Sequence, residues 1–411
     1  MKYKKRTVSD RIMGLAAHFS IVVVTGARQV GKSTLINNIF PDWNCVVFDP
    51  VVDVGNARQD PEFFLQNHAT PLILDEIQYC PELVAVIKRR VDMHKQPGMY
   101  VLTGSQQWSV LKTIAESLAG RAVFVDLEGF SLCEAAEQIP QKNWVKQYLD
   151  SPTEFLNQRH SRLSMQRSVY ELLWRGSLPE ADTLPPDYLS DYFAGYIRTY
   201  VERDIRLLLN ADDWQQFGRF VQLVSALTSS EMNYSQLGRE IGITPQTARR
   251  WLSVLSATFQ WYELPAYHGN TIKRISAKPK GYFSDTGIAC YLNRISTAQA
   301  LAGHPLIGAL FETAVVAEIR KQLSSLGQKP QLYHWRIHSG SEVDVIMEQD
   351  GVLYPMEIKL NSRPKPKDAR GLRAFRENYP KHSIAPGLVI APSETVMRLS
   401  ENEYVIPWDL R

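Results

Sequence analysis

The chain has 411 residues, of which 44% are hydrophobic and 22% charged, and its formal net charge at pH 7 is +3. This composition is that of a globular protein and excludes a disordered or fibrous chain, while the length predicts about two to four domains. A charge so close to neutral excludes a global positive field, so any binding of nucleic acid has to come from local basic patches.

The sequence carries no sign of export or of membrane insertion. Its four cysteines lie far apart without a C-x-x-C pair, which argues against zinc and for a reducing compartment. No apolar signal segment follows the basic N-terminus, and no window approaches ~18 uninterrupted apolar residues. We therefore expect a cytoplasmic protein that spans no membrane.

Residues 1–130 are predicted to form an α/β domain built on a parallel sheet. Short apolar strands alternate there with amphipathic segments, which is typical of a parallel sheet covered by helices. Ligands bind such sheets beyond the carboxyl ends of the strands, so polar residues at those ends are the candidates for a site. The predicted strands are Ile21–Thr25, Cys45–Asp49, Leu72–Asp75, Tyr100–Thr103 and Ala122–Leu127.

The first strand leads into a glycine-rich loop and then a helix-compatible run. Gly26 and Gly31 let the backbone curl so that N–H groups point at phosphate oxygens, and the following helix presents its positive end. Lys32 would contact the β- and γ-phosphates, and the Ser33 hydroxyl would ligate Mg²⁺. The loop therefore predicts ATP and Mg²⁺ as ligands. Its residues are Gly26, Ala27, Arg28, Gln29, Val30, Gly31, Lys32, Ser33 and Thr34.

A pair of carboxylates ends the third predicted strand. Asp75 suits Mg²⁺, directly or through water, and Glu76 is placed to polarise the water that attacks the γ-phosphate. The fourth strand ends near two hydroxyls, Thr103 and Ser105, and either one can sense the γ-phosphate or orient the water. A solvated strand end and a simple turn are the alternatives for these two segments.

Arg121 precedes the last predicted strand, at an edge away from its own phosphate loop. It is a candidate arginine finger that would reach a neighbour's nucleotide and make hydrolysis depend on a homo-oligomer. The alternative is an arginine that caps the C-terminus of the preceding helix. Arg28, inside the loop, is a weaker candidate for the same chemistry or for a partner contact.

Residues 131–225 are predicted to form a helical connector or lid, because Leu, Tyr and Trp recur at helical spacing and prolines break the pattern. In residues 192–206, tyrosines and an arginine lie about one turn apart, which indicates a core stripe with a solvated opposite face. A contact of Arg203 or Arg206 with a nucleotide or another domain is the alternative.

Residues 226–295 carry the pattern of a winged helix-turn-helix. A short helix is predicted to end at Gly242, and Thr244 can cap a second helix whose first turn contains a proline. Residues 259–264 and 281–284 are candidate wing strands. Such modules bind DNA in some proteins and act as protein-binding or lid modules in others, and both alternatives stay open. The residues that the second helix would present to DNA are Gln246, Thr247, Arg249 and Arg250.

Residues 296–411 hold a second set of chemically active side chains. Residues 335–347 are predicted as one strand, followed by a turn at 348–351 and a returning strand at 352–359. Residues two apart on a strand share a face, so this hairpin would bring acidic side chains of both strands together.

Asp344 and Glu357 on this hairpin could hold Mg²⁺ through hard oxygen ligands, and Glu312, on a predicted helix at 310–318, could supply a third carboxylate. Lys359 shares a face with Glu357 and could orient or deprotonate an attacking water or stabilise a phosphoryl oxyanion.

Two resemblances follow from these motifs. The acidic pair ends a strand that is separated from the loop strand by one other strand. This arrangement resembles that of the additional-strand, catalytic-glutamate ATPases, to which the AAA-type superfamily belongs. The C-terminal helix glutamate, aspartate and Glu-x-Lys hairpin resembles the PD-(D/E)XK core of restriction-endonuclease-like phosphodiesterases. Domains of that kind can also bind DNA without cutting it.

Over nearly its whole length the chain resembles a prokaryotic ATPase family that joins an AAA-type domain to domain of unknown function 4143. The resemblance implies an ATPase with a winged-helix segment and an endonuclease-like fold, and it leaves the physiological substrate undefined. The stretches that carry it are GARQVGKST, LILDEIQ, LAGR, TYVERDIR, YFSDTGIACYL, LFETAVVAEI and SEVDVIMEQDGVLYPMEIK.

Three functions are compatible with the sequence. The first is an ATPase, associated with DNA, whose ATP cycle regulates a metal-dependent endonuclease-like domain. The second is an ATP-dependent switch that binds DNA or protein and has an inactive nuclease fold. The third is a scaffold in which ATP only sets the oligomeric state.

Overall fold

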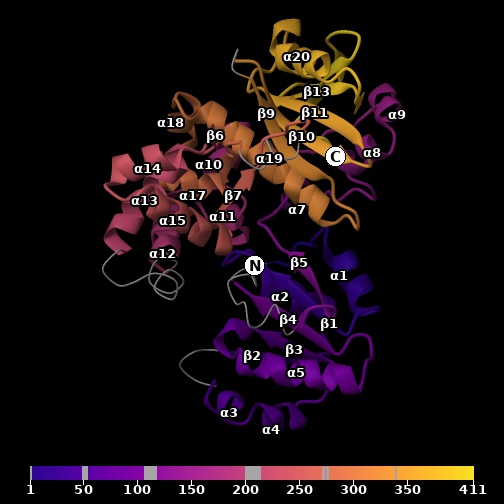
Figure 1. The fold of residues 1–411 in the computed structure, drawn as a ribbon, viewed down its shortest axis with the longest axis vertical. Helices are drawn as coiled ribbons and strands as arrows, with labels where there is room; N and C mark the ends of the chain where they lie inside the picture. The colour runs from indigo at the N-terminus through magenta and orange to yellow at the C-terminus, as the bar shows by residue number, and fades with distance from the viewer. Residues whose placement is uncertain are drawn as a thin grey trace. The chain divides into compact units, whose positions relative to one another are not determined.

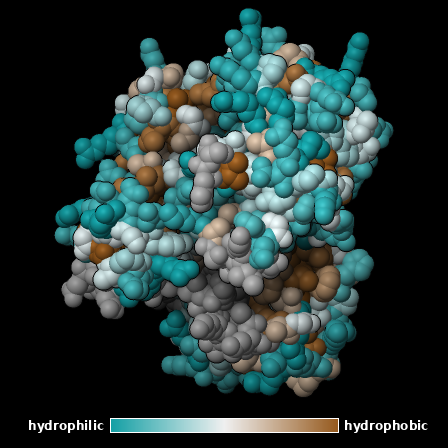
Figure 2. Space-filling view, turned by 45° about the horizontal axis from the view of Figure 1, so that its top comes forward, coloured by the Kyte–Doolittle hydropathy of each residue, from teal (hydrophilic) through white to brown (hydrophobic). Residues whose placement is uncertain are grey.

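The computed structural model describes residues 2–48, 54–105, 118–199, 214–270, 274, 277–337 and 340–411. The chain divides into two compact units, residues 1–129 with 255–260 and residues 130–254 with 261–411, whose elements are labelled in Figure 1. Hydrophilic side chains cover most of the face seen in Figure 2. No helix among the described residues is long and apolar enough to cross a membrane.

A five-stranded parallel sheet, in the order β2-β3-β4-β1-β5, is the frame of the first unit. All residues of β1, β3 and β4 are buried, as expected for a parallel sheet covered on both faces, and this explains their continuous apolar runs. The predicted strands are confirmed to within two residues at their ends, and Asp49 lies outside the described residues. The strands are β1 (Ile21–Thr25), β2 (Asn44–Val47), β3 (Leu72–Asp75), β4 (Tyr100–Gly104) and β5 (Ala122–Asp126).

Helix α5 (Glu82–Met93) packs its apolar face on this sheet, where Leu83, Ile87 and Val91 share a core with residues of β1, β3 and β4 (Figure 1). The helix expected before Arg121, over residues 109–118, lies outside the described residues except for Leu118. The other helices of the unit are α1 (Ser9–Ala16), α2 (Lys32–Ile39), α3 (Val54–Gln59), α4 (Pro61–Gln66) and the 3₁₀ turn η1 (Ile77–Tyr79).

The second unit begins with short helices, some of which start at prolines of the sequence. Pro152 and Pro179 occupy the first turn of α9 and α11, where a missing N–H does no harm. Helix α12 buries Phe193 and Tyr196, so part of the predicted aromatic stripe is core, whereas Arg203 and Arg206 lie outside the described residues. The helices are α7 (Leu132–Ala135), α8 (Trp144–Asp150), α9 (Pro152–Asn157), α10 (Val169–Arg175), α11 (Pro179–Thr183), η2 (Pro186–Tyr188), α12 (Leu189–Thr199) and α13 (Trp214–Ala226).

A winged helix follows, as the sequence predicts. Gly242 ends the first helix in the left-handed conformation with φ 78°, and the Thr244 hydroxyl accepts from the Thr247 N–H at 3.1 Å to cap the second helix. The wing is a three-stranded antiparallel sheet in the order β6-β8-β7. The elements are α14 (Tyr234–Ile241), α15 (Pro245–Ala257), β6 (Ser230–Glu231), β7 (Trp261–Leu264) and β8 (Lys280–Phe283).

The C-terminal part is a mixed seven-stranded sheet, in the order β14-β15-β13-β11-β10-β9 with β12 beside β11. Helix α20 lies over β10 and β11, and its Leu372 and Phe375 join a core with residues of the sheet. The elements are α17 (Thr286–Leu292), α18 (Ala298–Ala302), α19 (Ile307–Ser324), β9 (Gln331–Arg336), β10 (Glu342–Gln349), β11 (Val352–Ile358), η5 (Pro366–Ala369), α20 (Arg370–Asn378), β12 (Ser383–Ile384), β13 (Gly387–Ala391), β14 (Met397–Arg398) and β15 (Glu403–Pro407).

The single strand predicted over residues 335–347 is wrong. The chain turns back between β9 and β10, which pair antiparallel with Arg336 opposite Glu342. Gly340 has φ 90°, a conformation that favours glycine, and the Ile337 N–H donates to the Ser341 carbonyl at 3.0 Å. The next turn, at Asp350 and Gly351, lies where the sequence predicts it, with φ values of 53° and 78°.

Asp285 ties the helical connector to the winged helix. Its carboxylate caps α17 by accepting from the Ile288 N–H at 3.0 Å, and it also accepts from the N–H and hydroxyl of Ser177 at 2.7 and 2.9 Å. Gly176 is required beside it, because a Cβ there would lie 2.2 Å from an Asp285 oxygen. The run Ser-Asp-Thr-Gly at residues 284–287 therefore has a structural role.

We expect Asp285→Ala to lower the free energy of unfolding by about 2–4 kcal/mol, since three donors in a buried site lose their charged acceptor. Urea titration followed by tryptophan fluorescence measures this change. The control is Thr297→Ala, which removes a single hydrogen bond from an exposed cap on α18 and should lower the same free energy by about 1 kcal/mol. Equal losses in the two variants would show that Asp285 is an ordinary cap.

Candidate functional site

The glycine-rich loop joins β1 to α2 in a tightly constrained conformation. Gly31 precedes the helix with φ 91° and Gln29 has φ 61°, so the loop folds back on itself before α2 begins at Lys32. Gly26 lies against the end of β5, where a Cβ would stand 2.1 Å from the Leu127 carbonyl oxygen. Such a loop leaves room for an anion only because its glycines lack side chains.

Lys32 lies inside this loop. Its Nζ donates to the carbonyls of Gly26 at 3.1 Å and Ala27 at 3.0 Å, and the residue is 5% exposed. A bound phosphate would offer the same ammonium a charged acceptor, which makes a stronger hydrogen bond than a carbonyl does. The ammonium therefore lies inside the loop, on carbonyls that it would have to leave to contact a phosphate.

Arg6 supports the loop from behind, a role that the sequence did not reveal. The buried guanidinium donates to the Val30 carbonyl at 2.8 Å and to the carbonyls of Glu128 and Gly129 at 2.7 and 3.1 Å. It thus joins the loop to the segment after β5. Nothing in the run Lys4-Lys5-Arg6 separates this arginine from the lysines beside it, because two of its three partners lie over a hundred residues away.

The acidic pair at the end of β3 is linked to β4, the strand between it and the loop strand. The Thr103 hydroxyl donates to an Asp75 carboxylate oxygen and accepts from the Glu76 N–H at 3.1 Å. Gln78, which the sequence did not single out, donates to Glu76 and, at 3.1 Å, to the Ser105 hydroxyl. Thr103 therefore contacts the pair directly, and Ser105 contacts it through Gln78.

The residues at this edge of the sheet fit a magnesium–nucleotide complex. The Ser33 hydroxyl, in the first turn of α2, and the Asp75 carboxylate are hard oxygen ligands of the kind that Mg²⁺ prefers. Thr34 is exposed on the same turn. Arg28 is turned toward η1, where it donates to the Tyr79 hydroxyl at 3.0 Å.

Arg121 lies before β5, at the opposite end of the parallel strands from the loop. Its guanidinium makes a two-point ion pair with Asp92, at 2.5 and 2.9 Å, and donates to the Ala119 carbonyl at 3.0 Å. The pair raises the pKa of Arg121 and lowers that of Asp92. Arg121 therefore lies away from its own loop, and it is engaged within its own domain.

The second helix of the winged helix exposes Gln246, Arg249 and Arg250, while Thr247 is half-buried and its hydroxyl lies 2.9 Å from that of Thr244. The guanidinium of Arg249 lies 5.4 Å from the centre of the Tyr234 ring.

An open cavity of about 760 Å³ lies next to Arg249, between the winged helix and β9. Arg274 and Lys278 add positive charge to its wall, and Tyr333 adds an aromatic ring. Arg274 stacks within 4.9 Å of the Tyr333 ring and pairs with Glu348 at 3.0 Å. The groove combines cations with aromatic faces, the chemistry that binds nucleic-acid backbones and bases.

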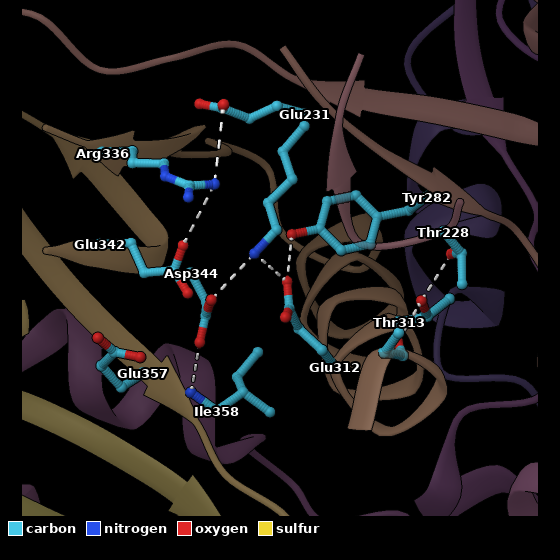
Figure 3. A network of polar contacts seen from close by, with 12 residues as sticks. Thr228, Glu231, Tyr282, Glu312, Thr313, Arg336, Glu342, Asp344, Glu357 and Ile358 are labelled. Atoms are coloured by element: carbon cyan, nitrogen blue, oxygen red, sulfur yellow. Dashed lines mark hydrogen bonds and ion pairs between the residues drawn. The ribbon is translucent and has the colours of Figure 1, made fainter. Parts of the chain in front are cut away.

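The C-terminal carboxylates Glu312 and Asp344, labelled in Figure 3, contact a lysine of the wing. Lys280 Nζ lies 2.6 Å from a Glu312 oxygen and 3.0 Å from an Asp344 oxygen, and Tyr282, two residues along β8, donates to Glu312 at 2.7 Å. The other Asp344 oxygen accepts from the Ile358 N–H at 2.9 Å.

Glu357 lies at the far side of this cluster. It accepts from Lys359 Nζ at 2.9 Å, so the predicted shared face of these two residues is present. Helix α20 covers Glu357, since a Cβ on Gly371 would stand 2.2 Å from one carboxylate oxygen.

Burial and neighbouring charges both shift the pKa values of these carboxyl groups. Burial raises the pKa of Glu312 to about 7, and the charge of Asp344 adds to this. Burial likewise raises the pKa of Glu357. Burial alone would raise the pKa of Asp344, but Lys280 and Lys359 outweigh it and lower the pKa below its usual range.

As they stand, these side chains do not fit a metal ion. Among the described residues no three or more His, Cys, Asp or Glu side chains surround a common metal position. The predicted magnesium ligands Glu312, Asp344 and Glu357 are close in space, but Lys280 occupies the place between the first two. The sequence signal for this lysine was the alternation of Lys280 and Tyr282 on one strand. The wing strand predicted over residues 281–284 began one residue too late to include Lys280.

Comparisons with known proteins agree with this layout. A family model described as an AAA domain matches residues 18–136, a domain of unknown function, DUF8612, matches residues 166–299, and another, DUF4143, matches residues 307–410. The stretches TYVERDIR and YFSDTGIACYL, which carry part of the resemblance noted above, fall within the second match.

The chain is also similar to proteins of several organisms. Uncharacterised proteins of Mycobacterium bovis and Mycobacterium tuberculosis are 26% identical to it over 411 residues, which is 100% of this chain and 85% of theirs. The Walker-type ATPase of Pyrococcus abyssi is 14% identical, with 71% of this chain and 99% of that chain covered and a TM-score of 0.42. The RuvB Holliday junction branch migration motor of Thermotoga maritima is 15% identical, with 67% and 95% covered and a TM-score of 0.30.

The AAA match spans the glycine-rich loop and the acidic pair, and the DUF4143 match spans the carboxylate hairpin. The chain thus joins an AAA domain, which contains the glycine-rich loop, to a C-terminal DUF4143 domain.

Proposed function

We propose that the N-terminal domain binds ATP with Mg²⁺ and hydrolyses it to ADP and phosphate. The observation that supports this most is the convergence, at one edge of one parallel sheet, of the phosphate loop with a threonine-linked acidic pair. Magnesium would be held by Ser33 and Asp75 and would neutralise charge on the phosphates.

Each side chain of this site then has a defined task. The loop N–H groups and Lys32 bind the phosphates, and Glu76 accepts the proton of the attacking water. Thr103, by bonding both Asp75 and the Glu76 backbone, fixes the two carboxylates relative to each other. We therefore assign the γ-phosphate sensing position to Thr103, with Ser105 and Gln78 orienting Glu76.

We expect Glu76→Gln to bind ATP normally and to hydrolyse it about 10²–10⁴-fold more slowly, because the amide cannot accept a proton. Lys32→Ala should instead lose nucleotide affinity. Binding of a fluorescent ATP analogue and release of inorganic phosphate measure the two steps. Asp42→Asn, an exposed acidic position in the same domain, is the control and should change neither. Undiminished phosphate release by Glu76→Gln would remove Glu76 from the chemistry.

We further propose that the protein works as a homo-oligomer in which Arg121 acts on a neighbour's nucleotide. The support is the location of Arg121 at the sheet edge away from its own loop. In this role the ion pair of Arg121 with Asp92 opens on assembly. An arginine supplied in this way speeds hydrolysis by stabilising charge in the transition state.

Arg121→Ala should assemble normally, as measured by sedimentation with a nonhydrolysable ATP analogue, and lose about 10³-fold in turnover. Asp92→Ala breaks the same ion pair but keeps the guanidinium, so its turnover should match that of the wild type. If both variants lose turnover equally, the pair is structural and the finger role is wrong.

The second unit, we propose, associates with DNA through the winged helix and the groove beside it. Arg249 and Lys278, with Arg274 paired to Glu348, place local positive charge at a cavity that Glu263 also lines. The ATP cycle would then control this unit. The proposed domain boundaries, at about residues 130, 225 and 295, separate the ATPase domain, the helical connector, the winged helix and the nuclease-like domain.

Replacing both Arg249 and Arg250 with alanine should weaken DNA binding at least about tenfold at 50 mM salt and reduce its salt dependence, because two phosphate contacts are lost. Fluorescence anisotropy of a labelled duplex over a salt series measures both. Arg239→Ala, an exposed basic position on the first helix, is the matched control. An affinity equal to that of the control would exclude this helix as the reader of DNA.

Two forms of this function differ at the C-terminal site. In one, the ATP cycle regulates metal-dependent cleavage by Asp344, Glu357 and Lys359. In the other, the nuclease fold is silent and the protein is an ATP-dependent switch. The ion pairs of Lys280 with Glu312 and Asp344 favour the second form.

A further inference from the structure

We propose that Lys280 is the resident cation of the C-terminal carboxylate cluster, so that this cluster binds the chain's own ammonium in place of a divalent metal ion. The inference concerns the second unit alone and does not depend on ATP hydrolysis.

The first argument is the position of the ammonium. Lys280 Nζ lies within 3.0 Å of oxygens from both Glu312 and Asp344. A magnesium ion shared by the same two oxygens would stand about 2.1 Å from each and would overlap the ammonium. Metal and lysine therefore exclude each other at this place.

The second argument is that each carboxylate of the cluster also accepts from another donor of the chain. The Ile358 N–H takes the second oxygen of Asp344, the Tyr282 hydroxyl shares the Glu312 oxygen, and Lys359 takes one oxygen of Glu357. While Lys280 is present, a metal ion would compete with these donors as well as with the ammonium.

The third argument is that Lys280 cannot easily withdraw. It lies in the central strand of the wing, paired with Glu231 on β6 and Leu264 on β7, and only 7% of the residue is exposed. Gly281, next to it, fits under Trp261, because a Cβ there would stand 1.9 Å from the indole ring. The strand that carries the ammonium is thus fixed on both edges and on one face.

Neighbouring contacts hold the same two parts together. The hydroxyls of Thr228 and Thr313 lie 2.7 Å apart, and Arg336 lies 3.8 Å from Glu231 and 3.9 Å from Glu342 (Figure 3). Lys280 is therefore the buried centre of a polar joint between the wing and the C-terminal helix and sheet, and the charges of that joint substitute for a metal centre.

The test measures Mn²⁺ binding to nucleotide-free full-length protein by electron paramagnetic resonance. The wild type and Asp344→Asn should bind equal amounts, since the cluster holds no metal. Lys280→Met should bind one additional Mn²⁺ per chain, with an affinity at least about tenfold higher than that of any site of the wild type. Adding Asp344→Asn to Lys280→Met should remove this additional Mn²⁺. Tyr282→Phe, which loses a hydrogen bond to Glu312 but keeps the ammonium, should gain none.

Two results would overturn the proposal. One is that the wild type binds Mn²⁺ and that Asp344→Asn loses it. This comparison does not depend on whether any Lys280 variant folds. The other is a folded Lys280→Met protein, verified by circular dichroism, that gains no Asp344-dependent Mn²⁺. If Lys280→Met does not fold, Lys280→Arg keeps a cation at the position and should bind no more Mn²⁺ than the wild type, while a gain of metal would contradict the proposal.

Discussion

The candidate nucleotide site depends on one close backbone approach. Gly26 lies so near the Leu127 carbonyl oxygen that no other residue fits, and this contact fixes the phosphate loop against the end of β5. Arg6 reinforces it by donating to carbonyls of the loop and of the segment after β5. These contacts hold the loop in one backbone conformation, and preorganised N–H groups favour strong electrostatic binding of an anion.

The C-terminal half shows how one charge can change the chemistry of a fold. The carboxylates, hairpin and lysine of an endonuclease-like motif are present, and Asp344 and Glu357 are buried close together. Carboxylates without a counter-ion would be strongly destabilising there, so a cation has to be supplied. Lys280 supplies one from a neighbouring sheet, and the cluster then stabilises the joint between two parts of the chain.

Much of the fold could be predicted because its signals are local. The runs of β1, β3 and β4, the loop after Gly26, and the turn at Gly242 are each encoded within about ten residues of sequence. The β9–β10 turn was missed because Gly340 lies inside an otherwise strand-like run, and a single glycine does not distinguish a turn from a bulge.

The site was predicted less completely, for a physical reason. Arg6 contacts residues 24 to 123 positions away, and Lys280 contacts Asp344 across 64 positions, so neither partner is visible in any sequence window. Hydrogen-bonding residues such as Gln78 and Tyr282 are common types whose role depends on what faces them. The chemically distinctive residues were therefore found, and the groups that position or neutralise them were not.

The most direct test of the account is a crystal structure of the protein with Mg²⁺ and a nonhydrolysable ATP analogue. We predict phosphates on the backbone of residues 26–34, with Lys32 turned from the carbonyls of Gly26 and Ala27 to the phosphate oxygens. A nucleotide bound elsewhere, or an empty loop at saturating analogue, would contradict the central claim that this loop is the ATP site.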